Sequence, residues 1–315
     1  MFLGPINFIK YTIFTFLIEI SVYGAYLGGM RFFMITTDHL CGRIWFRDKE
    51  DFRAAMNYVA IVAVLAGVKI VAFVLMSNHV HFIVACEDES RARAFIDRFK
   101  LKYGLYFWRR YGVKEHLREN NVQIQAVDTG EESLERAIAY VQMNPVAAGI
   151  CQHASLYSWG TGAVFFNQTQ PRGTPLHTLS KREQIACFHC KDPVPGHYLL
   201  GEDRYILLSS YVSVGFVESL FRSSKRYNYF LATSSKARAR LEKDAAPAFQ
   251  DKNVLAGAID LCRSLYGVSS FDELSDSQFV EILRQMKFRF GTGLEQLVRI
   301  TGRSSQDLSV KLDSM

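Results

Sequence analysis

The chain has 315 residues, of which 49% are hydrophobic and 22% charged; this globular composition excludes a mostly disordered, collagenous or low-complexity protein. Its 37 basic and 31 acidic residues give a net charge of +6, which permits a nucleic-acid partner without demonstrating one. Six cysteines are too few for a disulfide scaffold, so a reduced, cytoplasmic setting is expected.

The N-terminal residues 1–29 are apolar enough to suggest a signal peptide or a membrane anchor. Glu19 interrupts the run, Lys10 is its only positive charge, and the longest unbroken stretch, 11–18, falls far short of the about 20 residues that a membrane span needs. Met30 directly precedes a strand pattern. We therefore expect translation to begin at Met30, with a non-native upstream extension and no membrane association. A native apolar element and a secretory signal are the alternatives.

The next elements alternate between strand and helix patterns. Residues 31–37 have strand composition, and 49–66 carry apolar residues at helical spacing. Residues 69–76 form a nearly continuous apolar run, which is typical of a buried strand, and 79–85 form another. The short Ser77–Asn78 turn between them predicts a β-hairpin.

A second helix, strand and helix follow. Residues 90–111 predict a long helix, 122–127 a short strand, and 133–143 a helix that Ser133 caps and that stops at Asn144–Pro145. The resulting β-α-β-β-α-β-α order predicts an α+β fold, in which a ferredoxin-like antiparallel sheet carries helices on one face. The last helix is an addition to that plan.

The C-terminal half differs in its residue composition and in its predicted elements. Four prolines among polar residues indicate a loop-rich linker over 167–200, and 201–315 is expected to be a helical accessory region. A helix-turn-helix is predicted within 277–312, with Gly302 at the turn and Ser304 as cap of the second helix. The side chains placed to contact duplex DNA are Arg303, Ser305, Gln306 and Lys311. A small helical bundle without DNA contact is the alternative.

The histidine pair His79 and His81 is the sharpest local feature. Strand alternation places both imidazoles on one face, and Val80 on the other, toward the core. Two neutral imidazoles on one face can share a metal ion. Two histidines on a solvent-facing strand are the alternative.

The predicted helix 133–143 carries a second polar constellation. Arg136, Tyr140 and Asn144 are spaced four residues apart and share one helix face. The phenol could act as a nucleophile and the amide oxygen as a metal ligand. An ordinary core-edge tyrosine and a helix-ending asparagine are the alternative.

Residues 91–118 contain nine basic and two acidic residues, with aromatic residues between them. Such charge contacts phosphates regardless of sequence. The predicted DNA contacts on this helix are Arg91, Arg93, Arg98, Lys100, Lys102, Arg109 and Arg110, to which Arg136 is added. An amphipathic helix with core aromatics and a solvated charged face is the alternative, which we favour for the aromatics.

Taken together, these motifs resemble a known family. MSNHVHFIV (76–84) resembles the histidine signature of single-tyrosine HUH transposases, and YVQMNPVAAGI (140–150) is similar to the tyrosine helix of their REP-associated branch. HASLYSWGTGAVFF (153–166) resembles the segment that follows that helix. The resemblance covers 30–166. Ser77 stands where relatives often carry proline, and Ala147 where they often carry arginine.

The resemblance implies a metal-dependent enzyme that cleaves and rejoins single-stranded DNA, recognising a hairpin. Tyr140 would attack the scissile phosphate, leaving a 5′-phosphotyrosine and a free 3′-OH. His79, His81 and Asn144 would bind Mg²⁺ or Mn²⁺. The chain would act as a monomer or homodimer.

No nucleotide cofactor is expected, since the chain has no phosphate-binding glycine loop. A catalytically idle DNA-binding regulator derived from such an enzyme is the main alternative. An RNA-binding ferredoxin-like module is another, but it would need exposed aromatics on the central strands.

Overall fold

The computed structural model describes residues 29–38, 44–114, 120–169, 171–235, 251–290 and 292–313. The expectation of a non-native N-terminal extension concerns residues that, apart from Gly29, lie outside these ranges. Within the ranges, no helix combines the length and the apolar character needed to cross a lipid bilayer.

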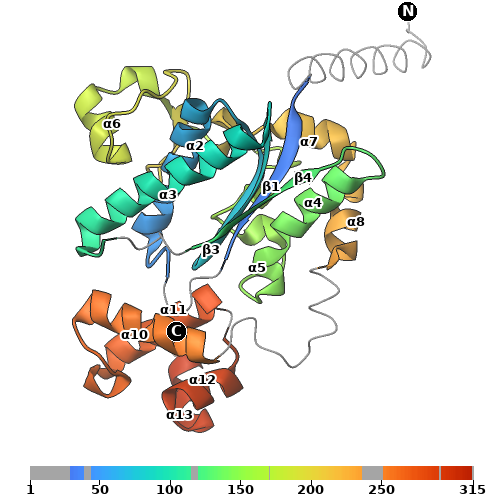
Figure 1. Ribbon diagram of the computed structural model, residues 1–315. Coiled ribbons are helices and arrows are strands. Elements are labelled where there is room, and N and C mark those ends of the chain that lie inside the picture. Colours follow the sequence, from blue (N-terminus) through green and yellow to red (C-terminus); the bar gives the residue numbers. More distant parts are fainter. Residues whose placement is uncertain are drawn as a thin grey trace, which may run out of the picture.

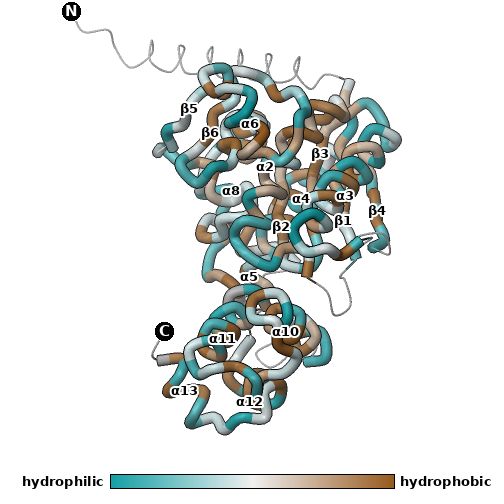
Figure 2. The backbone as a smooth tube through the Cα atoms, turned by 90° about the vertical axis from the view of Figure 1, so that its left-hand side faces the viewer, coloured by the Kyte–Doolittle hydropathy of each residue, from teal (hydrophilic) through white to brown (hydrophobic). Residues whose placement is uncertain are grey.

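A four-stranded antiparallel sheet lies at the centre of the described structure (Figure 1). Its strands are β1 (Arg31–Thr37), β2 (Lys69–Met76), β3 (His79–Cys86) and β4 (Val122–Val127). They lie in the order β2-β3-β1-β4, and each neighbouring pair is antiparallel, which is the predicted split βαβ arrangement. The most hydrophobic stretches gather along this sheet (Figure 2), because β2 and β3 are covered on both faces.

Two helices cover one face of the sheet: α2 (Lys49–Ala66) and α3 (Glu89–Tyr111) (Figure 1). Their observed ends agree with the prediction within one residue, because capping residues define them. The Asp48 and Asp88 side chains accept hydrogen bonds from N–H groups in the first turns. Phe82 of β3 packs against Phe95 and Phe99 of α3, with ring centroids 5.1 and 5.6 Å apart.

The additional helix covers the opposite face as α4 (Ser133–Gln142), followed directly by α5 (Asn144–Ala147). The prediction that Ser133 caps α4 is wrong. The N-cap is Glu132, which has a φ of 62° and makes no side-chain cap hydrogen bond, while the Ser133 N–H is satisfied by the carbonyl of Gly130. Pro145 ends α4 and lies in the first turn of α5, where no N–H donor is needed.

The exposed edge of β2 is covered by a later segment. The Leu75 N–H donates to the carbonyl of Trp159 at 2.8 Å, and the Phe73 N–H donates to the hydroxyl of Thr161 at 3.0 Å. Gly160 is needed between them, because a Cβ there would lie 3.0 Å from the Phe73 carbonyl oxygen. This segment, with η1 (Ala154–Leu156) and η2 (Thr161–Ala163), therefore completes the sheet and protects it from edge pairing.

Residues 167–200, expected to be a linker, contain more regular structure than predicted. Their elements are β5 (Thr174–Pro175), η3 (Leu176–Thr178), α6 (Lys181–Phe188) and β6 (Leu199–Leu200). The buried Asn57 of α2 donates to the carbonyls of Cys187 and Arg204 and accepts from the Ile206 N–H. The segment is therefore fastened to α2, since a buried amide requires hydrogen-bond partners.

The remaining elements are mostly helical, as predicted. They are η4 (Leu208–Ser210), α7 (Val214–Phe221), α8 (Ser224–Thr233), α10 (Asp251–Tyr266), η5 (Phe271–Glu273), α11 (Asp276–Phe290), α12 (Leu294–Thr301) and α13 (Ser305–Asp313). Helices α7 and α8 lie beside α4, whereas α10 to α13 form a separate group at one end of the sheet (Figures 1 and 2).

Candidate functional site

The two histidines lie together on the face of the sheet that α4 covers. Their ring centroids are 4.8 Å apart with the ring planes at 83°. His79 is 4% exposed and His81 3%, while Val80 between them is fully buried toward α2 and α3. The strand alternation predicted from the sequence therefore brings both imidazoles into one buried site.

Each imidazole has an oxygen partner at Nδ1. The amide oxygen of Asn78 lies 2.8 Å from Nδ1 of His79, and the hydroxyl of Thr36 lies 3.2 Å from Nδ1 of His81. The amide oxygen of Asn78 can only accept, which favours the tautomer of His79 with Nδ1 protonated and a lone pair on Nε2, whereas the Thr36 hydroxyl can donate to His81 or accept from it. The two imidazoles are thus oriented by Asn78 and Thr36, neither of which the sequence motifs predict as a site residue.

Tyr140 of α4 joins the histidines across the gap between helix and sheet. Its ring centroid lies 6.1 Å from that of His81, with the ring planes at 84°, and the residue is half-buried. The structure therefore brings together the strand motif and the helix motif, which are 59 positions apart in the sequence between His81 and Tyr140.

Asn144 lies one turn further along, at the start of α5, and is 5% exposed. Its amide nitrogen donates to the carbonyls of Tyr140 and Val141, at 3.0 and 3.2 Å. These two bonds use the nitrogen end of the side chain, so its oxygen is the end suited to a further ligand.

Packing fixes α4 against the sheet. Leu134, Ile138 and Val141 are at most 1% exposed and form the buried side of the helix, as the sequence predicts. Buried hydrophobic contacts of this kind supply most of the stability of a short helix. At the C-terminal end of α4, the Gln142 amide donates to the Thr161 hydroxyl, which ties the helix to the segment covering β2.

The predicted metal ligands are the two histidines and the amide oxygen of Asn144. Among the described residues, no group of three or more His, Cys, Asp or Glu side chains could hold a metal ion. The amide oxygen of Asn144, which that count does not include, is of the carbonyl type that suits Mg²⁺ and Mn²⁺, and imidazole is a common ligand of transition metals. Metal binding by these three residues stays a prediction.

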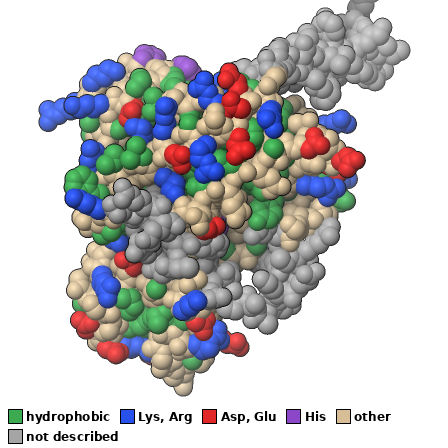
Figure 3. All heavy atoms as spheres, in the orientation of Figure 1, with side chains coloured by type: hydrophobic (Ala, Val, Ile, Leu, Met, Phe, Trp, Pro, Cys, Tyr) green, Lys and Arg blue, Asp and Glu red, His purple; other side chains and the backbone are tan. Residues whose placement is uncertain are grey.

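The basic residues of α3 lie away from this site, on the other face of the sheet. Five of the seven α3 cations predicted to contact DNA donate to groups of the chain itself. Arg98 donates to the Leu65 carbonyl, Lys100 to the Asn120 carbonyl, Arg109 to the His189 carbonyl, Lys102 to Asp192, and Arg110 to Asp48 and Asp51. Arg91 and Arg93 are exposed. In the view of Figure 3, basic and acidic side chains are interspersed, so DNA contact by this helix stays a prediction.

Arg110 belongs to a buried polar network at the C-terminal end of α3. The Asp51 carboxylate accepts from Arg110 at 2.6 Å and from the hydroxyls of Tyr106 and Tyr111 at 3.0 and 3.1 Å. Burial raises the pKa of Asp51, and the nearby Asp48 charge adds to the rise. Burial also acts to raise the pKa of Asp48, but hydrogen bonds from Arg110 and from the Asp51 N–H outweigh it and lower that pKa.

Three of the remaining predicted DNA contacts, Arg136, Arg303 and Lys311, also have partners. Arg136 is exposed beside Tyr140 and pairs with Glu132 at 3.0 Å. The Arg303 guanidinium lies 4.2 Å from the centre of the Phe279 ring, Lys311 pairs with Asp276 at 2.8 Å, and Gln306 is exposed.

The helical elements of the predicted helix-turn-helix are present in α12 and α13. Gly302 has a φ of 69° at the turn, and the Ser304 hydroxyl accepts from the Asp307 N–H. Its binding to DNA stays a prediction.

Two further polar residues lie next to the site. In the β1–β4 register, Thr36 faces Gln123 and Met34 faces Gln125, so both glutamines lie on the same face as the histidines. Both are exposed. Alternating polar residues in the predicted strand 122–127 were the available signal, but the face they occupy depends on the register with β1.

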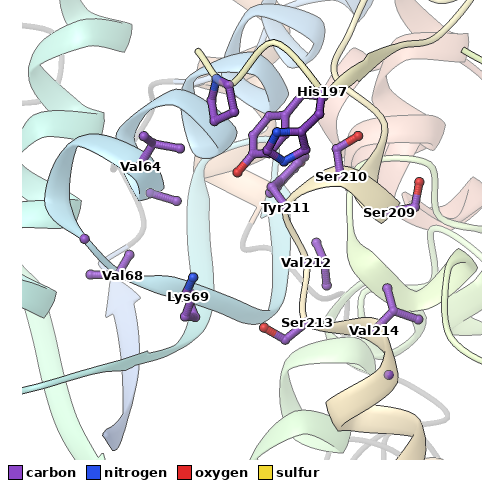
Figure 4. Close-up of a pocket in the computed structure, with 15 residues that line it drawn as sticks. Val64, Val68, Lys69, His197, Ser209, Ser210, Tyr211, Val212, Ser213 and Val214 are labelled. Carbon is purple, nitrogen blue, oxygen red and sulfur yellow. The ribbon is translucent and has the colours of Figure 1, made fainter. Parts of the chain in front are cut away.

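A pocket of about 700 Å³ lies elsewhere, between the end of α2, the start of β2 and the segments 195–198 and 209–215 (Figure 4). Lys69, His197 and Tyr211 are among the residues that line it. Lys69 begins β2, whereas the histidine site lies beyond its other end, next to Met76. The predicted site residues do not line this pocket.

Residues 44–144 match the family model described as IS200-like transposase. This segment is therefore similar in sequence to IS200-like transposases. The matched residues contain both histidines, Tyr140 and, as their last member, Asn144. No curated protein matches the chain.

One solved structure is similar to part of this chain. It is described as a REP-associated tyrosine transposase bound to a REP hairpin. It has 18% sequence identity and a TM-score of 0.33, and the match covers 44% of this chain and 78% of that chain.

Proposed function

We propose that the chain cleaves and rejoins single-stranded DNA through a covalent 5′-phosphotyrosine intermediate, with Tyr140 as the nucleophile. The observation that carries this proposal is the position of Tyr140, whose ring lies 6.1 Å from that of His81 in a site with two buried imidazoles and an amide. An exposed or isolated tyrosine would have no such surroundings. The IS200-like match over the same residues supports it.

The exchange balances as a phosphoryl transfer. The Tyr140 phenol oxygen forms a bond to the scissile phosphorus and loses its proton, while the bond from phosphorus to the 3′ oxygen breaks and that oxygen gains a proton. The products are a 5′-phosphotyrosine and a free 3′-OH. Because the phosphotyrosine bond conserves the phosphodiester energy, a 3′-OH from another strand reverses the exchange without a nucleotide cofactor.

His79, His81 and Asn144 would hold a divalent metal, Mg²⁺ or Mn²⁺. When bound, the metal supplies Lewis-acid polarisation of the phosphate and neutralises charge in the transition state. The chain itself contributes the orientation of the ligands: Asn78 and Thr36 hold the imidazoles, and the backbone carbonyls of α4 hold the Asn144 nitrogen. The fixed helix places the nucleophile one turn before the amide ligand.

The substrate strand would approach from the open side of the site, along β4. Gln123 and Gln125 are exposed there and offer both donors and acceptors to unpaired bases. Arg136, one turn before Tyr140, would contact a backbone phosphate. Arg91 and Arg93 at the start of α3, and Arg303, Gln306 and Lys311 in the last two helices, would contact the stem of a hairpin.

The proposal assigns catalysis to residues 30–166 and an accessory DNA-binding role to 201–315. The segment 167–200 would connect them while packing on α2. We further propose that the protein acts in the cytoplasm as a monomer or homodimer.

A covalent-adduct assay tests the proposal. Single-stranded DNA from the flanks of the gene is incubated with the protein and Mn²⁺, with or without EDTA, and resolved on a denaturing gel. Tyr140→Phe is compared with Tyr229→Phe, which alters an exposed tyrosine on α8. We expect a metal-dependent adduct with wild type and Tyr229→Phe only. Hairpin binding without any adduct would contradict the proposal and favour a catalytically idle DNA-binding protein.

A further inference from the structure

The turn before β3 is joined to the C-terminal helices by a closed ring of hydrogen bonds. The Ser77 hydroxyl donates to the carbonyl oxygen of Arg289 in α11 at 3.1 Å. The carbonyl oxygen of Ser77 accepts from the Phe46 N–H at 3.1 Å, and the Arg289 guanidinium donates to the Phe46 carbonyl. All three residues are at most 3% exposed, so the ring lies in the interior.

A buried charge makes this ring sensitive to small displacements. Burial lowers the pKa of Arg289 to about 10, while the charges of Asp48 and Asp51 act in the opposite direction, so the guanidinium is charged at neutral pH. Its Nε donates to the side-chain oxygen of Gln285 at 2.7 Å. A buried charged donor loses much of its favourable interaction energy when a hydrogen-bond partner moves away, because no water replaces that partner.

The contact extends beyond the ring. Arg47 forms an ion pair with Asp260 of α10 at 2.9 Å. Gly257 packs so closely that a Cβ there would lie 2.6 Å from the Phe290 ring and 3.3 Å from Ile44. The segment that contains Ile44 and Arg47 is therefore held against the C-terminal helices.

The turn also carries the residue that orients His79. Asn78 follows Ser77 directly, is 3% exposed, and places its amide oxygen 2.8 Å from Nδ1 of His79. The β2–β3 ladder, in which His79 faces Met76, fixes the backbone of His79. The orientation of the ring therefore depends on Asn78, and the position of Asn78 depends on the turn.

We propose that α11 positions the His79 imidazole for metal binding, acting through Arg289, Ser77 and Asn78. This inference rests on the proposed metal-dependent cleavage and adds that the accessory region completes the metal site as well as contacting DNA. Ser77 and Arg289 are positioning residues in this scheme. The link depends on the hydroxyl of Ser77, because that group donates to the Arg289 carbonyl.

The test compares Ser77→Ala with Ser264→Ala in the full-length protein. Both variants remove a hydroxyl that donates to a backbone carbonyl, but Ser264 bonds to Leu261 within α10. The affinity for Mn²⁺ in the absence of DNA is measured from the electron paramagnetic resonance signal of the free Mn²⁺ ion. The His79 ring nitrogens are followed by NMR in the metal-free protein, and melting temperatures are recorded. Asp260→Asn, which weakens the largely buried ion pair with Arg47, serves as a second, milder variant.

We expect Ser77→Ala to weaken Mn²⁺ binding by up to about tenfold, because it displaces Asn78, and outright loss of such an outer partner of a metal ligand costs about 10–100-fold. In Ser77→Ala the NMR signals of the His79 ring nitrogens should shift from those of the Nδ1-protonated tautomer toward those of a mixture of tautomers. Asp260→Asn should shift the same signals in the same direction but by less. Ser264→Ala should leave them unchanged. Unchanged His79 signals in Ser77→Ala would overturn the inference. A wild-type protein that binds no Mn²⁺ would instead contradict the proposed function, while the metal-free NMR comparison would still decide the positioning role.

Discussion

Replacing Asp51 by asparagine tests how far the buried network at the end of α3 stabilises the fold. The Asp51 side chain is 0% exposed, and its two oxygens accept four hydrogen bonds, from the Arg47 N–H, Arg110, Tyr106 and Tyr111. Asparagine keeps the shape of the side chain but replaces one acceptor oxygen by an NH₂ group. The two hydrogen bonds that this oxygen accepted are therefore lost, because donor would then face donor. The negative charge opposite Arg110 is also lost.

The expected loss follows from these contacts. A hydrogen bond to a charged group contributes about 1.5–3 kcal/mol, so losing two gives about 3–6 kcal/mol. Relief of the burial penalty that raises the pKa of Asp51 offsets part of this, and Arg110 keeps its bonds to Asp48. We therefore expect a loss of about 3 kcal/mol, or a melting temperature lower by roughly 4–5 °C for a chain of 315 residues.

Urea denaturation measures the change, with Asp192→Asn as the control. Asp192 pairs with Lys102 of the same helix, but the two side chains are 25% and 20% exposed. A partly solvated pair of this kind contributes about 1 kcal/mol or less. A loss for Asp51→Asn no larger than that for Asp192→Asn would refute the reasoning.

The pH dependence gives the same variant a second test. Because the folded pKa of Asp51 lies above its unfolded value, its protonation favours the folded state, and this contribution is lost as the pH rises through the folded pKa. The stability gap between wild type and Asp51→Asn should therefore widen as the pH falls from 7 toward about 4, the ordinary aspartate pKa. A gap that narrows over this range would contradict the direction of the shift.

Three other predictions concern the site and the sheet edge. Replacing both His79 and His81 by alanine should abolish adduct formation in Mn²⁺ but preserve hairpin binding in EDTA; a residual metal-stimulated adduct would refute the proposed ligands. Replacing both Gln123 and Gln125 by alanine should reduce discrimination between cleavage-site sequences several-fold in competition cleavage, whereas unchanged discrimination would exclude β4 from base contact. Gly160→Ala should cost about 1–2 kcal/mol in urea denaturation, because its Cβ would lie 3.0 Å from a β2 carbonyl oxygen; unchanged stability would mean that the edge segment moves freely.

The sequence predicts the sheet and its helices closely because their signals are local. The apolar runs of β2 and β3, the helical periodicity of α2 and the glycines after α2 and α3 all act within a few residues. The prediction of a Ser133 cap is wrong because the carbonyl of Gly130 accepts from the Ser133 N–H group in a turn before the helix. That alternative depends on backbone conformation, which residue type alone does not determine.

The shared face of the two histidines, and that of Tyr140 and Asn144, could be predicted because each motif follows the period of its own strand or helix. Their partners were not found, because Thr36 reaches His81 only through the register of β1 with β3. The basic residues of α3 show the same limit of prediction from sequence, because their partners are set by tertiary contacts. Spacing predicts a basic face, but the acids that pair with Lys102 and Arg110 come from segments remote in the sequence.

Peptide mapping of the covalent adduct tests the central claim most directly. Wild-type protein is incubated with cleavable single-stranded DNA and Mn²⁺, digested with nuclease and protease, and analysed by mass spectrometry. The account predicts a nucleotide linked through its 5′-phosphate to Tyr140 and no such linkage in Tyr140→Phe. A linkage at another tyrosine, or cleaved DNA without any linked peptide, would contradict the assignment of Tyr140 as the nucleophile.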